Sequence, residues 1–150
     1  MKPAQRIEDL IAWQIACQLR DLIDRMVDGP RVCNDFHFKS QITSSSASVP
    51  SNLAEGFGRF FPKVNANHVR IAKASLTETQ NHLKHGKTQN YWNATDYETA
   101  WRLSCRTMKA TTNYLRYLES CNNEVPSNER STPEDAIPKE AQGPPKDAVG

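Results

Sequence analysis

Long apolar runs are missing from this 150-residue chain. No stretch approaches the roughly 20 consecutive apolar residues that a helix needs to cross a bilayer. The first residues include Lys2 and Arg6, but no apolar core follows them, so no secretory signal peptide is visible. These absences argue against a membrane partner and favour a cytoplasmic protein.

Paired cysteines are also missing. The chain has four widely spaced cysteines, which are Cys17, Cys33, Cys105 and Cys121. They form no C-x-x-C pair, so we expect reduced thiols and neither disulfides nor a metal site. Cys17 and Cys105 are expected to fill the core as small apolar side chains.

The residue patterns of common enzymes are absent as well. The sequence has no glycine-rich phosphate loop and no nucleophile next to a general base. The serine cluster Ser44 to Ser46 has no identifiable base near it in the sequence. We therefore expect a protein that is not an enzyme, with no catalytic residues, no cofactor and no small-molecule substrate.

Helical periodicity is present through most of the chain. Helices are predicted over about Glu8 to Val27, from near Phe36 to Gly56, over about Pro62 to Asn90, and from Thr95 to about Cys121. Short connections force neighbouring helices to run antiparallel. The predicted fold is therefore all-α, an antiparallel up-down-up-down left-handed four-helix bundle of residues 1–121. Residues 122–150 offer little to bury and are predicted to be a disordered polar tail.

Apolar stripes predict which face of each helix is buried. On the first helix the predicted stripe is Ile11, Ile15, Leu19, Leu22 and Met26. On the third it is Val69, Ala72, Leu76, Thr79 and Leu83. On the fourth it is Tyr97, Trp101, Ser104, Met108, Thr111, Leu115 and Leu118. Glycine weakens a helix by about 1 kcal/mol relative to alanine, so the third helix is expected to fray after Gly86.

The helix termini carry capping signals, and the second helix carries a proline. Asp35 is predicted to cap the second helix, and Thr95 and Glu98 are predicted to form a capping box on the fourth. Pro50 stands inside the second helix, where the helical pattern continues on both sides. This arrangement predicts a kinked helix held by its neighbours.

Three motifs carry a family resemblance. The run V-P-S-N-L-A-E-G-F-G-R over residues 49–59 resembles the signature of the four-helix-bundle proteins encoded by intervening sequences of bacterial 23S ribosomal RNA. The stretches I-E-D-L-I-A-W-Q-I-A (residues 7–16) and I-A-K-A-S-L-T-E-T (residues 71–79) agree and follow in the same order. That family is more distantly similar to the accessory variability determinant proteins of diversity-generating retroelements, which are pentameric partners of a reverse transcriptase. The resemblance implies a ring-like homo-oligomer, with a pentamer as the expected form.

Six residues are assigned to the structural motif: Trp13, Pro50, Asn52, Glu55, Gly56 and Glu78. Glu55 and Glu78 are flanked by small or apolar residues, so they are expected to accept hydrogen bonds from Asn52, Ser75 or backbone at a helix crossing or a subunit contact.

A metal site on the third helix is the alternative for Glu78. Glu78, His82 and His85 project from one side of that helix, and His68 is a candidate for a fourth ligand. No second cluster supports them, and the pattern is not H-E-x-x-H, so no physiological metal is expected.

Basic residues recur along one side of the third and fourth helices. They are Arg70, Lys73, Lys84, Lys87, Arg102, Arg106, Lys109 and Arg116. Residues 59–121 contain ten Lys and Arg against four Asp and Glu, although the whole chain carries only +2. If the two stripes form one surface, it attracts the phosphate backbone of RNA or DNA through counterion release. The alternative is that these side chains only keep the outer face solvated.

Together these patterns predict a non-catalytic oligomeric scaffold that binds RNA, or a nucleic-acid enzyme such as a reverse transcriptase, through the basic face. The competing hypothesis is a structural or protein-interaction module that binds no nucleic acid. Trp13, Trp92 and Trp101 are interpreted first as core or interface anchors. Trp92, in a loop beside Tyr91, is the tryptophan that is a candidate for base stacking.

Overall fold

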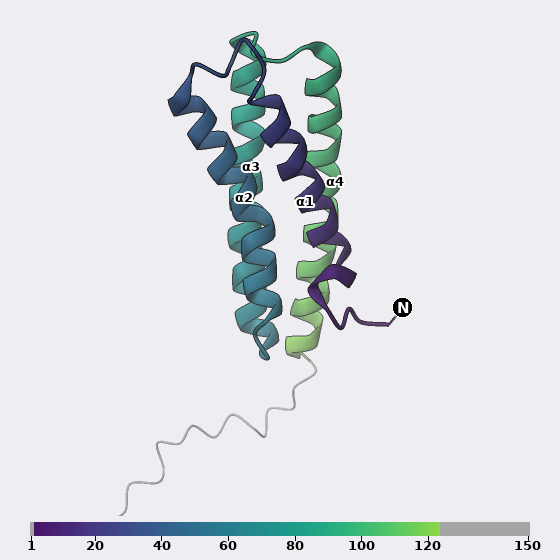
Figure 1. Cartoon of the computed structure of the whole chain (residues 1–150). Helices are drawn as coiled ribbons and strands as arrows, with labels where there is room; N and C mark the ends of the chain where they lie inside the picture. The colour runs from purple at the N-terminus through teal and green to yellow at the C-terminus, as the bar shows by residue number, and fades with distance from the viewer. Residues whose placement is uncertain (1, 124–150) are drawn as a thin grey trace, which may run out of the picture.

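Four α-helices account for most of residues 2–123, the part of the chain that the computed structural model describes (Figure 1). A 3-10 turn, η1 (Ile7–Asp9), precedes them. The helices are α1 (Ile11–Met26), α2 (Phe36–Phe57), α3 (Pro62–Thr88) and α4 (Ala94–Asn123). Residues 2–123 contain no strand, which confirms the all-α prediction. The predicted disordered tail lies outside the described residues, except for Asn122 and Asn123, which end α4.

The helices form a closed four-membered arrangement. Each helix packs on the next one along the chain, and α4 packs back on α1. Consecutive helices run in opposite directions, as Figure 1 shows, which confirms the up-down-up-down order. No helix in the described part of the chain combines the length and the apolar character needed to cross a membrane.

The buried face of α1 differs from the predicted one. Leu19 and Met26 are buried as predicted, but Ile11 is 58% exposed, and Ile15 and Leu22 are only half-buried. The rest of the buried face is Ala12, Ala16 and Ile23. The prediction was wrong because α1 is apolar on more than one side. The small alanines let the neighbouring helices approach, and Ile11 and Ile15 lie at the flank of the buried face.

The start of α1 also differs from the prediction. Glu8 and Asp9 belong to η1 and not to the first turn of α1, which begins at Ile11. The Asp9 carboxylate accepts from the Arg6 backbone N–H at 3.1 Å, and this hydrogen bond lowers the pKa of Asp9. The acidic pair therefore stabilises a separate short turn.

The core stripes of α3 and α4 are closer to the prediction. All five predicted residues of α3 are fully buried. On α4, Ser104, Thr111, Leu115 and Leu118 are buried as predicted, whereas Tyr97, Trp101 and Met108 are half-buried. Ala100 and Thr107 take the central positions instead. The α4 stripe is therefore rotated slightly from the predicted direction, and its aromatic residues lie toward α3.

The predicted cap of α2 is confirmed, and the predicted cap of α4 is wrong. The Asp35 carboxylate accepts from the Phe38 backbone N–H at 3.0 Å, which confirms the predicted cap. At α4 the cap is Asn93, whose Oδ1 accepts from the Asp96 N–H at 2.7 Å while its Nδ2 donates to Asp96 Oδ2 at 2.9 Å. The predicted box of Thr95 and Glu98 is wrong because α4 begins before Thr95.

Pro50 lies inside α2 without interrupting it, as predicted. Because Pro50 has no N–H, the carbonyl of Ser46 lacks its usual helical donor. Figure 1 shows the axis of α2 bending partway along its length. Small polar side chains join α2 to α3 here: Ser48 and Ser75 share a hydrogen bond of 2.9 Å, and Thr79 donates to Ser45 at 2.9 Å.

Two buried glycines allow close approaches that a side chain would prevent. A Cβ on Gly56 would lie 2.7 Å from Asn65 Oδ1 and from His68 Cβ, so this glycine sets the spacing of α2 and α3. A Cβ on Gly86 would overlap the indole of Trp92. The expected fraying after Gly86 is therefore wrong. Gly86 is where Trp92 packs, and α3 continues to Thr88.

Candidate nucleic-acid interface

The basic stripe of α3 lies on the side of that helix that meets α4. Lys84 Nζ is 5.0 Å from the ring centroid of Trp101, and Lys87 Nζ is 4.6 Å from that of Tyr97. Such cation–π contacts are worth about 0.5–1 kcal/mol at exposed sites. Both lysines are exposed, so the rings position the ammonium groups along the α3–α4 seam while leaving them accessible to a ligand.

Arg70 belongs to the same seam but has a carboxylate partner. Its Nη2 lies 2.8 Å from Glu119 Oε1 of α4, and its Nη1 donates to Asn67 Oδ1 at 2.9 Å. Both members of the ion pair are about half exposed, so the pair contributes at most about 1 kcal/mol. Part of the positive charge at this point is offset. Lys73, the remaining member of the stripe, is half-buried.

The basic stripe of α4 lies on the outer side of that helix. For both Arg102 and Lys109, the residue two positions before and the residue two positions after are buried. Each residue turns a helix by about 100°, so two residues turn it by about 200°, and both cations face away from the core. Arg106 and Arg116 are exposed near them. Arg102 Nε is 2.7 Å from Glu98 Oε1 one turn earlier. The two stripes are thus neighbours, one in the seam and one on the outer ridge of α4.

The balance of charge on this surface is positive. Of the eight predicted cations, only Arg70 and Arg102 form an ion pair within residues 2–123. The other six are Lys73, Lys84, Lys87, Arg106, Lys109 and Arg116. We call the eight residues together the α3–α4 basic face. Its two carboxylates, Glu98 and Glu119, are already engaged by these arginines.

The two cation–π contacts of the basic face were not predicted from the sequence. Tyr97 and Trp101 were assigned to the core stripe, yet they support Lys87 and Lys84. The signal that could have revealed this is the alignment of aromatic residues of one helix with lysines of the next across a short connection. Trp92, in contrast, is only 6% exposed, and its Nε1 donates to the Leu83 carbonyl at 3.1 Å. Its suggested role in base stacking is therefore wrong.

A family model, described as 23S rRNA-intervening sequence protein, matches residues 8–113. The chain belongs to this family. The match covers α1, α2, α3 and most of α4, and it includes every residue of the basic face except Arg116. A comparison with curated proteins finds no match to this chain.

In this chain, the family motif around Pro50 and Gly56 packs α2 against α3. Pro50 and Gly56 are buried. Asn52 is half-buried and donates to the Ser48 carbonyl at 2.8 Å and to Ser48 Oγ at 3.0 Å. Ser48 in turn bonds to Ser75, so Asn52 braces the α2–α3 seam. Trp13 is half-buried against the core.

The two family-motif carboxylates have different partners from those expected. Glu55 is exposed and pairs with Arg59 at 3.2 Å, and Glu78 is exposed and lies 3.5 Å from His82 Nε2. Neither accepts the hydrogen bonds predicted from Asn52 or Ser75, which bond to Ser48 instead. Gly56 and Thr79, which follow them in the sequence, are buried, while the two carboxylates themselves are exposed.

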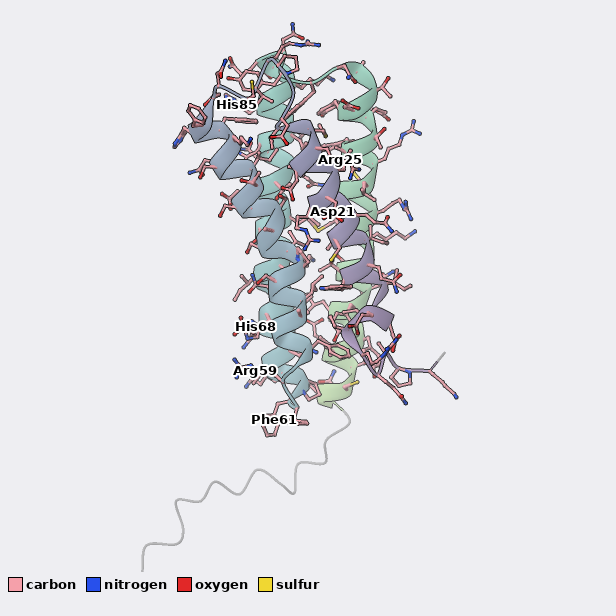
Figure 2. All side chains as sticks on the ribbon, viewed as in Figure 1. Asp21, Arg25, Arg59, Phe61, His68 and His85 are labelled. Atoms are coloured by element: carbon pink, nitrogen blue, oxygen red, sulfur yellow. The ribbon has the colours of Figure 1, made fainter. Side chains whose placement is uncertain are left out.

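The histidines and cysteines of the family bundle are dispersed. His68 stands 14 residues before His82 on α3, which is about 21 Å along the axis, so it does not join His82 and His85 (Figure 2). Within residues 2–123 no group of three or more His, Cys, Asp or Glu side chains is placed to hold a metal ion. Cys105 is exposed, which contradicts its predicted core role, and Cys17 is half-buried, where burial raises the pKa of its thiol.

Proposed function

We propose that this protein is a non-catalytic scaffold that binds RNA through the α3–α4 basic face. The observation that carries the proposal is the group of six cations on that face without a carboxylate partner in the described residues, beside two carboxylates already paired with arginines. Cations of this kind release counterions from a phosphate backbone without first breaking an ion pair. Phosphate contacts dominate such binding, so we expect little sequence preference.

Self-association is the second part of the proposal. Ile11 is 58% exposed and lies in a hollow between the N-terminal segment, α1 and α4. The lining is mostly apolar but includes three polar residues: Ala4, Leu10, Ile11, Ala12, Ala110 and Tyr114, with Lys2, Asp9 and Asn113. This apolar surface suits a second copy of the chain, and a ring, with a pentamer as the expected form, would repeat the basic face in each subunit. Weak phosphate contacts then gain from multivalency when one RNA spans neighbouring subunits. A nucleic-acid enzyme such as a reverse transcriptase is the protein partner consistent with this role.

Light scattering at micromolar concentration tests self-association. We expect several times the monomer mass for the native chain and a lower mass for Ile11→Glu, which places a charge on the apolar hollow. Ile71→Glu, at an exposed isoleucine of α3, is the control and is expected to keep the native mass. A native monomer would disprove the oligomer without bearing on the RNA contact.

A salt titration of binding to a structured RNA tests the basic face. The variant Arg106→Gln/Lys109→Gln removes two unpaired cations. The control Ser44→Glu/Ser51→Glu changes the net charge equally on exposed positions of α2, which does not pack on α4. Each lost phosphate contact lowers the slope of log affinity against log salt by about 0.7 for single strands and about 0.9 for duplex DNA. We expect the lower slope only in the first variant.

The competing function is a structural or protein-interaction module. It is favoured by the two ion pairs, Arg70 with Glu119 and Arg102 with Glu98, and by the lysines seated on aromatic rings, all of which are common on solvated surfaces. If the native protein bound no RNA even at low salt, this function would replace RNA binding. If the native protein and Arg106→Gln/Lys109→Gln gave equal slopes of log affinity against log salt, the RNA would bind at another surface.

A further inference from the structure

Two phenylalanines at one end of the bundle have almost no protein cover. Phe60 is 97% exposed and Phe61 is 71% exposed, both in the connection between α2 and α3. Figure 2 shows Phe61 at the extreme end of the bundle, away from the helices. Burying a side chain of this size is worth about 1.5–3 kcal/mol, and the fold leaves that free energy unused at both positions. We call these two residues the aromatic tip.

The backbone that carries the aromatic tip is closely held. The Arg59 N–H donates to the Gly56 carbonyl at 3.0 Å, and the Asn65 N–H donates to the Phe61 carbonyl at 3.0 Å. Pro62 occupies the first position of α3, where its fixed φ suits the helix. The tip is therefore a short connection between two helix ends, and its rings are presented with little backbone entropy to lose on binding.

Positive charge flanks the aromatic tip on both sides. Arg59 precedes it, and its pairing with Glu55 is an exposed contact of 3.2 Å that contributes little. Lys63 follows it, is exposed, and forms no ion pair within the described residues. The basic face begins at Arg70 on the same helix, about 12 Å along α3 from Pro62. Cations and exposed rings thus continue from the face to the end of the bundle.

We propose that Phe60 and Phe61 form a stacking platform for unpaired bases of an RNA strand whose phosphates lie along the α3–α4 basic face. This inference rests on the proposed function and adds the preferred form of the RNA, a single-stranded segment. Aromatic side chains stack on any base because every base has a π-face, and neighbouring cations hold the backbone. Unstacked bases are available in loops and single strands but not inside an RNA helix.

Single-stranded RNA containing 2-aminopurine tests the platform, because stacking quenches the fluorescence of that base. The variant is Phe60→Ala/Phe61→Ala. The matched control is Phe36→Ala, which removes a phenylalanine that is 77% exposed at the opposite end of α2. Loss of one base-stacking contact lowers affinity roughly 5- to 150-fold. We expect such a loss for the single strand, with less quenching and an unchanged salt slope, and no loss in the control.

Fully paired RNA of the same length supplies the second arm. The tip variant is expected to bind it as the native protein does, whereas Arg106→Gln/Lys109→Gln is expected to bind both RNAs more weakly. Phe60→Tyr/Phe61→Tyr keeps the rings and should retain native affinity for the single strand. Because all the substituted residues are exposed, we expect circular dichroism to show native helix content in every variant.

The outcomes separate the platform from the proposed function. If the charge variant loses affinity while the tip variant binds the single strand like the native protein, the platform is overturned and the basic face stands. If the native protein binds neither RNA at low salt, both are overturned. If the tip variant loses binding to phosphatidylserine vesicles but not to RNA, the tip is a lipid contact and the platform is overturned.

Discussion

The two ends of the bundle differ in how they cover the aromatic residues of their connections, although Phe36 at the start of α2 is exposed as well. At the end where α2 begins, the ring of Phe38 lies 5.1 Å from that of Tyr91 and 5.8 Å from that of Trp92, measured between centroids. At the other end, Phe60 and Phe61 have no such cover. The first end therefore contributes buried rings to the fold, whereas the second leaves two rings exposed.

Trp92→Ala should lower the free energy of unfolding more than any other substitution considered for the two ends. The indole is buried against Gly86 and donates to the Leu83 carbonyl, so its removal leaves a cavity and loses this hydrogen bond. Truncation of a buried tryptophan costs about 3–5 kcal/mol. We expect the free energy of unfolding, measured in urea, to fall by about that amount. A change below about 1 kcal/mol would show that this end is not the stabilising one.

Gly86→Ala should weaken the same end by overpacking. An added methyl would overlap the Trp92 indole, which cannot retreat without losing its hydrogen bond. Overpacking of this kind costs about 1–3 kcal/mol, which exceeds the roughly 1 kcal/mol that alanine gains over glycine in a helix. The measurement is again urea denaturation. Gly58→Ala, where a Cβ meets nothing closer than 3.6 Å, is the matched control and should be neutral or stabilising.

Asp35→Asn should produce a smaller, pH-dependent loss. The Asp35 carboxylate accepts two hydrogen bonds, one from the Tyr91 hydroxyl at 2.5 Å and one from the Phe38 N–H at 3.0 Å. These hydrogen bonds hold the pKa of Asp35 below its usual value. Because the folded-state pKa is lowered, the stabilisation is present above the unfolded pKa of about 3.9 and is lost as pH falls through the folded value.

Thermal unfolding across pH measures this effect. The variant should be less stable than the native protein at pH 7, and the difference should vanish in strong acid. Asp24→Asn, at an exposed position of α1, is the control and should show no such convergence. A constant difference between the native protein and Asp35→Asn at every pH would contradict the prediction.

Phe60→Ala/Phe61→Ala should have the smallest effect on stability. The side chains contact little of the protein, and surface substitutions away from such contacts usually lie within about 0.5 kcal/mol. We expect the midpoint of thermal unfolding to stay near the native value while single-stranded RNA binding falls. A large drop in stability would show that the tip supports the fold after all, and the contrast between the two ends would disappear.

Local patterns were enough for the parts of the fold that depend on one helix at a time. The stripe from Val69 to Leu83 was predicted correctly because its residues repeat in steps of three and four, which places them on one face of α3. The cap at Asp35 was predicted because it involves residues three apart. The continuity of α2 through Pro50 was also correct, since the helical pattern is present on both sides of it.

The identities of the basic residues in the candidate site also came from the sequence, but their surroundings did not. The contact of Arg70 with Glu119 joins residues 49 positions apart. Lys84 over Trp101 likewise depends on how α3 and α4 lie together. No periodicity within one helix contains that information, so the pairing of Arg70 and the aromatic support of Lys84 had to come from the tertiary structure. The pair of Arg102 with Glu98, in contrast, joins residues one turn apart on α4 and is a local feature.

The sequence by itself determined four helices, their order and the cations that they carry, because helical period and charge are local properties. Only the tertiary structure decided that Ala12 faces the core while Ile11 does not, and that Trp92 is buried while Phe60 is exposed. Each of these outcomes depends on which side of a helix or loop meets a neighbour distant in the chain. Packing between helices selects that side, because only one arrangement fills the space between them without overlap.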